Sequence, residues 1–496
     1  MLHGADSKKV IVLGLDGASW DFLDIMISAG SMPNLKTLIS RGTRGILESS
    51  FPPITPSAWP SITTGVNPGK HGIFDFVKTN YENGEQTLTT TRDLEHPRIY
   101  EMLAMQRIET MVFNPIPAYP IVPLKNLKVA SIAFSPKPVY HPDHMKKYAL
   151  TFPDYLELFD AGGKTVDKDL FLDLKLERTY QRVSIVEEAL RNVSWSLAWI
   201  RLQDPDDLLH TVGDIAYSSG KVHKMFAIID RLFDVSHDLA DLVVLVSDHG
   251  FRRYTRTISL NTLLYKEGLA IPESKHGLQD QYWAWNQSKY SQEREGGFRP
   301  PRVLQKFLQA HEMRLLTKLG NFALKISNRP YQFPKVDPIG SRAYSPTPYG
   351  DAVFVREASD LERTRQALTG REGIAEVKTR EDVYWGPYVT RSPNLLVMVD
   401  HVNGYRHGSN RIERHIWEEK IAWDHHPYGV ALLSGERVQP KASVLITSWD
   451  MTPTLMSYLG VPLPHDADGT ILKDLLDTSP VDRHDYSSNW NLAKVL

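Results

Sequence analysis

The chain has 496 residues, enough for a large hydrophobic core and for more than one domain. Apolar residues make up 42% and charged residues 23%, and the net charge of −2 gives no global field that would favour nucleic acid or an anionic membrane. Cysteine is absent, which excludes disulfides, thiolate metal sites and a cysteine nucleophile, and fits a reducing cytoplasm.

The N-terminal stretch, MLHGADSKK, is polar and lacks the apolar segment of a signal peptide. No uninterrupted apolar run approaches the roughly 20 residues that a membrane helix needs. We therefore expect a soluble, cytoplasmic protein that acts on a small molecule, with neither a nucleic-acid polymer nor a membrane as its partner.

Short β-branched runs that end in Asp or Gly indicate buried parallel strands, and the first of them is KKVIVLGLDG at residues 8–17. Similar runs and the helical patterns between them alternate along the chain. This alternation predicts an α/β sandwich with a mostly parallel sheet. Ligands of such sheets gather at the carboxyl ends of the strands. The later runs lie at 109–115, 196–205, 241–250, 393–400 and 429–435, and the clearest helical patterns at 32–42 and 182–193.

The stretch from Phe51 to Gly65, FPPITPSAWPSITTG, is rich in proline and in hydroxyl groups. Proline at this density stops a strand and fixes the chain at the start of a helix. Thr55 stands directly before Pro56, so one interpretation is a helix N-cap followed by its first-turn proline. The hydroxyl would then lie at the positive end of a helix, where phosphate binds readily.

The strand-and-helix rhythm breaks between about 261 and 377. We interpret this stretch as an inserted cap, with residues 1–260 and 378–496 forming the catalytic core. The cap would fold over the site and select the substrate through stacking and charged side chains. Aromatics that pack the cap's own core are the alternative. The candidates are Tyr282, Trp283, Trp285, Arg299, Arg302 and Arg342.

Acids and histidines follow several of the predicted strands. Carboxylate and imidazole together suit Zn²⁺, Mn²⁺ or Fe²⁺, and two ions could share the set. Two metals close together stabilise both the attacking and the leaving oxygen of a phosphoryl displacement. The set is Asp16, Asp206, His210, Asp248, His249 and His425, with the Thr55 hydroxyl added.

Each member of this set also has a purely structural interpretation. Asp16 after a strand could be a helix N-cap, and Asp206 with His210 could be a pair on one helix face. His425 could be an ordinary buried histidine. Adjacent side chains of a strand face opposite sides, so Asp248 and His249 can act together only from an irregular loop.

The ordered motifs resemble the alkaline phosphatase superfamily, in its type I phosphodiesterase / nucleotide pyrophosphatase branch. The stretch TPSAWPS…TGVNPGKHGIFDF looks closer to a prokaryotic group of predicted phosphohydrolases in that superfamily. The resemblance covers residues 9–77, 190–255 and 390–475. It implies an alkaline-phosphatase-like three-layer sandwich. The motifs are VIVLGLDG, PNLKTLISRGT, PPITPSAWPSITTGVNPGKHGI, DPDDLLH, VSDHGF, DHHPYGVALLSG and WDMTPTLMSYLGVPLPHDADG.

Carried over position by position, the resemblance implies two metal sites and a nucleophile. Zinc is the expected metal, with manganese as the alternative. Thr55 would be the nucleophile and would form a phosphothreonine intermediate. His425 is preferred over its neighbour His426 as the histidine of the family's His-x-Pro-x-Gly pattern. One metal would be held by Asp16, Thr55, Asp248 and His249, and the other by Asp206, His210 and His425.

The resemblance implies a metal-dependent hydrolase of a phosphodiester or phosphomonoester, with nucleotides among the candidates. Ala58 stands where nucleotide pyrophosphatases usually carry Asn, so an oxyanion donor would come from backbone N–H groups near Thr55, from Lys70 or from the cap. A phosphomutase, a phosphonate hydrolase and an inactive binding protein are the alternatives. A sulfatase is disfavoured because the sequence around Thr55 lacks the required Cys or Ser and Arg.

Overall fold

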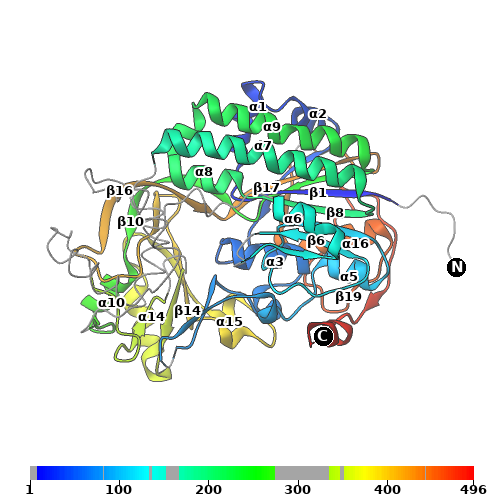
Figure 1. Cartoon of the computed structure of the whole chain (residues 1–496). Coiled ribbons are helices and arrows are strands. Elements are labelled where there is room, and N and C mark those ends of the chain that lie inside the picture. The colour runs from blue at the N-terminus through cyan, green and yellow to red at the C-terminus, as the bar shows by residue number, and fades with distance from the viewer. Residues whose placement is uncertain are drawn as a thin grey trace, which may run out of the picture.

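The computed structural model describes residues 8–81, 83–132, 137–151, 167–273, 334–346, 351–441 and 443–495. Its largest element is a nine-stranded sheet (Figure 1). From one edge to the other, the strands are β18 (Leu445–Thr447), β2 (Thr43–Glu48), β17 (Tyr428–Gly435), β9 (Leu242–Val246), β1 (Val10–Leu15), β8 (Leu197–Leu202), β5 (Thr110–Phe113), β6 (Leu127–Ser131) and β7 (Val139–His141).

The sheet is mostly parallel, which confirms the predicted fold class. β9, β1, β8, β5 and β6 run parallel to one another, and β18 runs parallel to β2. Two sequence interpretations need correction. The run at 429–435 forms β17, which is antiparallel to both of its neighbours, and the run at 393–400 forms β14 (Leu395–Val399) in a different sheet.

Helices cover both faces of the sheet and make it a three-layer sandwich (Figure 1). Strand β1 shows why, because its alternate side chains enter two separate cores. Ile11 and Leu13 join one core, and Val10 and Val12 join the other. The first core contains α1 (Trp20–Ser28), α2 (Pro33–Arg41), α7 (Lys168–Asn192), α8 (Asp204–Val212) and α9 (Gly220–Leu239), and the second contains α3 (Thr55–Thr64), α5 (Ile99–Met105) and α16 (Met451–Leu459).

Helix α3 lies against the strand β1 because a glycine makes room for it. A Cβ built on Gly14 would lie 2.5 Å from the Trp59 ring, so only glycine allows the indole to lie this close. Trp59 also meets Trp199 of β8 edge to face, with 6.5 Å between the ring centroids. This packing fixes the start of α3, and with it Thr55, near the carboxyl end of β1.

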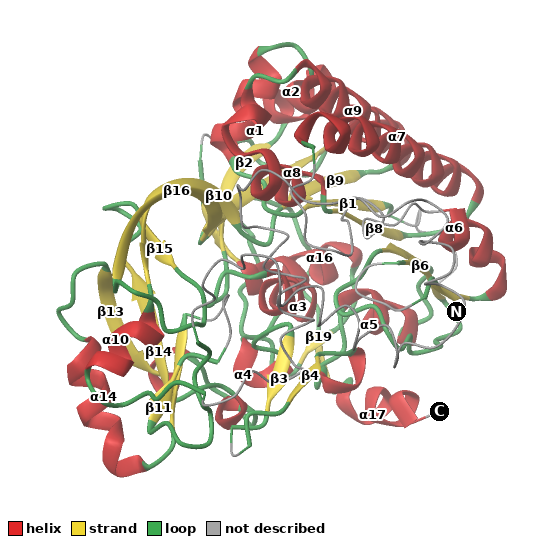
Figure 2. Cartoon of the chain, turned by 60° about the vertical axis from the view of Figure 1, so that its left-hand side comes forward, coloured by secondary structure: helices red, strands yellow, loops and turns green. Residues whose placement is uncertain are grey.

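A second lobe extends from the central sheet on a long antiparallel ribbon of β10 (Gly250–Ile258) and β16 (Trp417–His426), as Figure 2 shows. β15 (Tyr405–His407) joins this ribbon beside β10. The lobe has a hydrophobic core of its own. Its other elements are α10 (Leu260–Lys266), β11 (Ala343–Tyr344), β12 (Ala352–Val355), α14 (Leu361–Leu368), β13 (Ile374–Thr379), α15 (Arg380–Val383) and β14.

The described residues of the predicted insertion at 261–377 belong to this lobe, and the lobe's strands continue on both sides of that range. The boundaries of the insertion stay a prediction. Arg342 belongs to the described residues and forms a two-pronged ion pair with Asp360, at 2.5 and 2.8 Å. The other five candidates for substrate selection, Tyr282, Trp283, Trp285, Arg299 and Arg302, lie outside the described residues.

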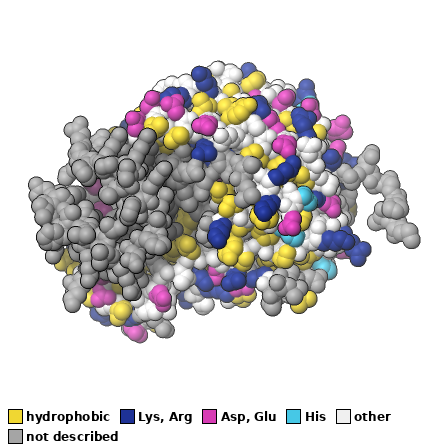
Figure 3. Space-filling view, viewed as in Figure 1, with side chains coloured by type: hydrophobic (Ala, Val, Ile, Leu, Met, Phe, Trp, Pro, Cys, Tyr) yellow, Lys and Arg dark blue, Asp and Glu magenta, His cyan; other side chains and the backbone are white. Residues whose placement is uncertain are grey.

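The remaining elements are short and lie around the core. On the visible face of the described chain, acidic and basic side chains are interspersed (Figure 3). Among the described residues, no helix combines the length and apolar character needed to cross a membrane. These short elements are α4 (Pro68–His71), β3 (Val77–Thr79), β4 (Gln86–Leu88), α6 (Lys146–Thr151), β19 (Leu463–Pro464), β20 (Arg483–His484) and α17 (Ser487–Val495).

Candidate active site

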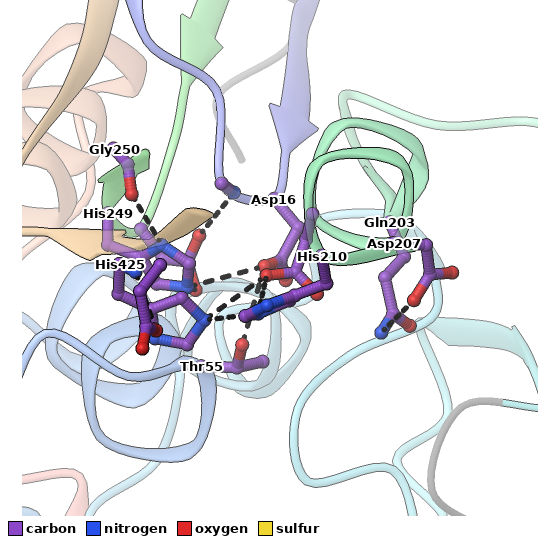
Figure 4. A network of polar contacts seen from close by, with 12 residues as sticks. Asp16, Thr55, Gln203, Asp207, His210, His249, Gly250 and His425 are labelled. Carbon is purple, nitrogen blue, oxygen red and sulfur yellow. Dashed lines mark hydrogen bonds and ion pairs between the residues drawn. The ribbon is translucent and has the colours of Figure 1, made fainter. Parts of the chain in front are cut away.

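The topology brings five separate chain segments to one edge of the central sheet, the edge formed by the carboxyl ends of its parallel strands. β1, β8 and β9 are parallel, so the residues that follow them meet at the same edge. β17 is antiparallel to β2 and pairs Tyr428 with Glu48, so the start of β17 and the end of β2 lie at that edge as well. Figure 4 shows side chains from these segments pointing toward one another, among them Asp16, Thr55, His210, His249 and His425.

Asp16 is fully buried directly after β1, and its two oxygens have different partners. Oδ2 accepts hydrogen bonds from Trp59 Nε1 at 2.8 Å and from Arg201 Nε at 2.9 Å. Oδ1 lies 3.3 Å from Thr55 Oγ1 and 3.6 Å from His249 Nε2. Burial raises the pKa of Asp16 while Arg201 opposes the rise. Asp16 is not a helix N-cap, because α1 begins only at Trp20, with Ser19 as the cap residue.

Thr55 is the first residue of α3, and the cap position belongs to Ile54. The prediction that Thr55 itself caps the helix is therefore wrong by one residue. The physical consequence is small, because the Thr55 side chain, only 4% exposed, still lies at the positive end of the helix. Its hydroxyl donates a hydrogen bond to Asp16 Oδ1 at 3.3 Å, and this contact directs the oxygen into the cluster.

Asp248 and His249 lie in the irregular turn between β9 and β10, as their joint use requires. Gly17 N donates to Asp248 Oδ1 at 3.3 Å, which leaves Oδ2 toward His249 Nε2 at 3.4 Å. The turn needs Gly250 for a steric reason, since a Cβ there would lie 2.0 Å from the Tyr428 carbonyl oxygen.

The environment shifts the pKa values of this buried pair in opposite directions, and both shifts favour the uncharged form. Burial and the nearby Asp16 hold the pKa of Asp248 well above its usual range. Burial and the neighbouring His425 hold the pKa of His249 well below its usual range. His249 is therefore a neutral imidazole, which is the form that binds metals.

Asp206 and His210 occupy successive turns on one face of α8, which begins two residues after β8 ends. His210 Nε2 and His425 Nε2 lie 3.4 and 3.3 Å from the same oxygen, Asp206 Oδ1, and 3.0 Å from each other. Burial opposes ionisation of Asp206, but the two imidazoles outweigh it and hold its pKa well below the usual range. The interpretation as a helix-face pair is thus correct, and that face is part of the cluster.

A buried ion network holds α8 on the side that faces away from the cluster. Lys175 of α7 lies 3.1 Å from Asp207 and 3.4 Å from Asp204, and all three side chains are at most 1% exposed. Thr179 also donates to Asp204 at 2.6 Å. Buried ion pairs hold their two partners in place, because a buried charge without a partner lowers the stability of the fold strongly. Asp207 points away from the cluster toward Gln203, whereas His210 points into it (Figure 4).

The adjacent histidines His425 and His426 face opposite sides of the β10–β16 ribbon. The His425 ring stacks on His249, with 3.8 Å between centroids, and contacts Asp206. The His426 ring lies nearer His401, at 5.8 Å between centroids, and its Nδ1 accepts from Tyr428 N. His425 is therefore the member of the pair that joins the cluster.

The residues present fit a cation site. Within the described part of the chain, three buried atoms of the cluster lack any hydrogen-bond partner: Asp206 Oδ1, Asp248 Oδ2 and His249 Nε2. Unpartnered buried atoms cost about 1–3 kcal/mol each, and a bound cation offsets that cost for carboxylate oxygens and neutral imidazole nitrogens. Potential ligand atoms converge in three groups, namely Asp16 with Asp248 and His249, Asp206 with His249 and His425, and His210 with Asp424 and His425.

Sequence reasoning missed three side chains that shape this site. Arg201 and Trp59 fix the orientation of Asp16, and Asp424 lies beside His210 and His425. A signal for Arg201 exists in the sequence, because it is the one charged residue in the apolar run SLAWIRL. A charge in a buried strand needs a buried partner of opposite sign.

Replacing Arg201 tests whether it positions Asp16. We expect Arg201→Met to lower metal content or turnover by about 10- to 100-fold, the usual range when the partner of a metal ligand is lost. Elemental analysis and turnover of p-nitrophenyl phosphate measure this. Trp59→Phe, which removes a donor to the same oxygen, should act in the same direction.

Arg44→Met provides the matched control for this prediction. The Arg44–Asp24 ion pair is 32% and 47% exposed, and pairs of this kind contribute little. If Arg201→Met and Trp59→Phe both behaved like this control, Asp16 would not depend on either donor.

The fold and the site define the chain as a member of the alkaline phosphatase superfamily, whose enzymes are metal-dependent phosphoester hydrolases. More narrowly, the chain belongs to the type I phosphodiesterase / nucleotide pyrophosphatase family, whose sequence model matches residues 10–336. The match includes every residue of the predicted metal and nucleophile set except His425. A comparison with curated protein sequences finds no match.

Solved structures with this fold include phosphonoacetate hydrolase from Sinorhizobium meliloti 1021 in complex with phosphonoformate. It is 15% identical, with a TM-score of 0.58, over 90% of this chain and 94% of that chain. Murine ectonucleotide pyrophosphatase / phosphodiesterase 5 is 14% identical, with a TM-score of 0.55, over 95% and 100% of the two chains. A variant of the alkaline phosphatase PafA is 14% identical, with a TM-score of 0.57, over 95% and 100%.

Proposed function

We propose that this enzyme hydrolyses a small phosphate ester, a phosphodiester or phosphomonoester with nucleotides included, through a phosphothreonine intermediate at Thr55. The observation that supports this most directly is the position of Thr55 Oγ1. It lies at the positive end of α3, buried, and 3.3 Å from Asp16 Oδ1 in the cluster that suits cations. A hydroxyl in that setting is both next to a phosphate-binding helix end and next to the groups that activate it.

The residues would hold two divalent ions, with zinc proposed first and manganese second. Asp16, Thr55, Asp248 and His249 would form one site, and Asp206, His210 and His425 the other. Ions bound there would lower the pKa of the threonine hydroxyl and offset the negative charge of the phosphoryl oxygens. The separation of Asp206 Oδ1 from both His210 and His425, 3.4 and 3.3 Å, supports their assignment to one site.

The protein's own groups then account for orientation and proton position. Asp16 Oδ1 accepts a hydrogen bond from the Thr55 hydroxyl, so the Oγ1 lone pairs point away from Asp16 and would be available to attack a phosphoryl group. In the first step Oγ1 bonds to phosphorus, its proton leaves, and the ester oxygen departs with the organic group as an alcohol. In the second step water attacks the same phosphorus, the bond from phosphorus to Oγ1 breaks, and Thr55 regains its proton. The product is phosphate from a monoester and a phosphomonoester from a diester.

Two candidate oxyanion donors named from the sequence are already engaged. Lys70 Nζ donates to the Asp466 carbonyl at 2.6 Å and forms an ion pair with Asp468. The backbone N–H groups of Ser57 and Ala58 donate to the Ile54 carbonyl. Pro56 has no N–H, so the first turn of α3 would act on a phosphoryl group mainly through its dipole and the N–H of Thr55.

Metal content and substrate turnover test the proposal on the full chain. Protein purified without chelator should carry about two divalent ions, as expected for a two-metal phosphoryl-transfer site. With Zn²⁺ or Mn²⁺ it should hydrolyse at least one of p-nitrophenyl phosphate, its phosphodiester analogue, nucleotides and sugar phosphates. Chelation should abolish that activity, and re-addition of metal should restore it.

Two outcomes would contradict the proposal. One is full activity in protein shown by elemental analysis to lack metal. The other is cleavage of phosphonoacetate, the ligand type of one solved relative, with every phosphate ester left intact. The second outcome would assign the site to C–P bond hydrolysis.

A further inference from the structure

A cavity of about 450 Å³ adjoins the metal-site cluster and lies between the two lobes. Its core side includes Ile54, the residue before Thr55, together with His210 of α8. The opposite side comes from the second lobe, through β10, the segment after β14, β15 and β16. A larger cavity of about 1000 Å³ has none of the metal-site residues in its lining. The smaller cavity is therefore the one placed to receive the organic part of a substrate.

Three side chains of the second lobe that line this cavity have buried polar atoms without a hydrogen-bond partner among the described residues. They are Thr257 Oγ1, His401 Nδ1 and Arg406 Nε. Thr257 is only 5% exposed, so water does not compensate its hydroxyl. Unpartnered polar atoms gathered at one cavity are typical of a binding site that a ligand completes.

Two basic side chains of the cavity are each paired with a carboxylate of its lining. Arg406 donates to Asp424 at 2.8 Å, and His407 lies 2.8 Å from Asp351. Burial lowers the pKa of His407, but Asp351 outweighs it and raises the net value, which favours the charged form of His407 beside Asp351. Paired ions of this kind offer both donors and acceptors, and they attract neither sign of charge strongly.

The wider lining disfavours a second anion. It contains three Lys and Arg side chains against five of Asp and Glu. A pyrophosphate tail or a carboxylate placed here would meet a net excess of carboxylates. Trp423 adds a flat apolar surface, and its ring is held in place by a hydrogen bond from Nε1 to Asp214 at 3.0 Å. A compact carbon skeleton that carries hydroxyl groups suits a cavity lined by paired ions, an excess of carboxylates and the Trp423 ring.

We infer that this cavity is the specificity subsite of the enzyme, and that it selects phosphate esters whose organic group is neutral and rich in hydroxyls, such as a polyol or a sugar. The inference rests on the proposed function. It assigns substrate selection to Thr257, His401 and Arg406, on strands and turns that flank the predicted cap at 261–377. Sites that hydrogen-bond a hydroxyl discriminate strongly against analogues that lack one.

Matched variants of the full chain test the subsite. Thr257→Val preserves shape and removes the hydroxyl, and Arg406→Lys preserves charge and removes Nε. Thr255→Val is the control, because Thr255 lies on the same strand, β10, and is exposed. The substrates are glycerol phosphate and glucose phosphate, p-nitrophenyl phosphate as an ester without hydroxyls, and ATP as one with a polyanionic tail.

We expect each cavity variant to lower kcat/KM for the polyol and sugar esters by about 10-fold, mainly through KM, as loss of a substrate hydrogen bond does. Turnover of p-nitrophenyl phosphate should change less than about 2-fold, and Thr255→Val should match the parent. Equal losses on all substrates, or a parent enzyme that prefers ATP to both hydroxyl-rich esters, would overturn the inference.

A binding measurement separates this inference from the proposed function. If the metal-loaded parent hydrolysed no phosphate ester, the proposed function would fail, and calorimetric titration with glucose phosphate would still test the subsite. Binding weakened by Thr257→Val but not by Thr255→Val would support it. Binding that is absent, or equal in both variants, would reject it.

Discussion

Thr55→Ala should lower the turnover of phosphate esters by about 10³-fold or more, because the proposed nucleophile is removed and nothing else in the cluster replaces it. The variant should keep its fold, since it loses only a methyl group, a hydroxyl and the 3.3 Å hydrogen bond to Asp16. Thr55→Ser should retain measurable activity, because the hydroxyl remains. Steady-state turnover of all three proteins at saturating Zn²⁺ or Mn²⁺ measures the effect.

Two further measurements make this result specific to the nucleophile. Thr63→Ala lies on the same helix and removes a hydroxyl that bonds only to backbone carbonyls of α3, so it should leave turnover unchanged. Mass spectrometry of acid-quenched enzyme should detect a phosphorylated peptide that contains Thr55 in the parent and not in Thr55→Ala. Normal turnover by Thr55→Ala would mean that water attacks phosphorus directly.

The sequence is most informative where a buried strand is a short apolar run with a polar residue at its end. Apolar runs that end abruptly in Asp, as at Asp16 and Asp248, indicate both a buried strand and the polar residue at its end. Parallel strands then bring those ends together without further information. This is why five side chains that follow strands, namely Asp16, Asp206, His210, Asp248 and His249, could be assigned to one region before their distances were known, whereas His425, which precedes the antiparallel β17, could be assigned only by the resemblance of its motif.

Long-range pairing is less predictable from the sequence. The β16 strand, Trp417–His426, has no buried residue along its length, so it carries no apolar alternation that would indicate a strand. β17 has the apolar composition of a buried strand, and composition does not reveal that its direction is reversed. These two strands carry the chain from the second lobe back into the central sheet, so the way the two lobes connect depends on them.

The residues that line the cavity between the two lobes are equally hard to predict from the sequence. Arg406 and His407 belong to the three-residue strand β15, and Thr257 lies one residue before the end of β10, so no motif spacing connects them to Thr55. The arginine that fixes Asp16 is different, because a charge within the apolar β8 had a signal of its own. Local composition predicts that such a residue matters, and only the fold identifies its partner.

His425→Ala should remove a large part of the bound metal, whereas His426→Ala should leave the metal content unchanged. The expectation follows from the ribbon, in which the His425 ring contacts Asp206, His210 and His249. Loss of one of three proposed ligands typically weakens the site that they form far more than loss of a neighbour outside it. Elemental analysis of both variants, dialysed side by side against metal-free buffer, gives the comparison.

The same two substitutions provide their own structural control. Both remove an imidazole from adjacent positions of β16, so a general weakening of the ribbon would lower thermal stability and metal content in parallel for the two variants. Burial and the nearby His401 lower the pKa of His426 to about 4, so it is neutral at pH 7 and its removal changes no charge there. Metal loss in His426→Ala with full retention in His425→Ala would shift the ligand by one position. That result would require β16 to present its other face to the cluster, opposite to the contacts of His425 with Asp206 and His249.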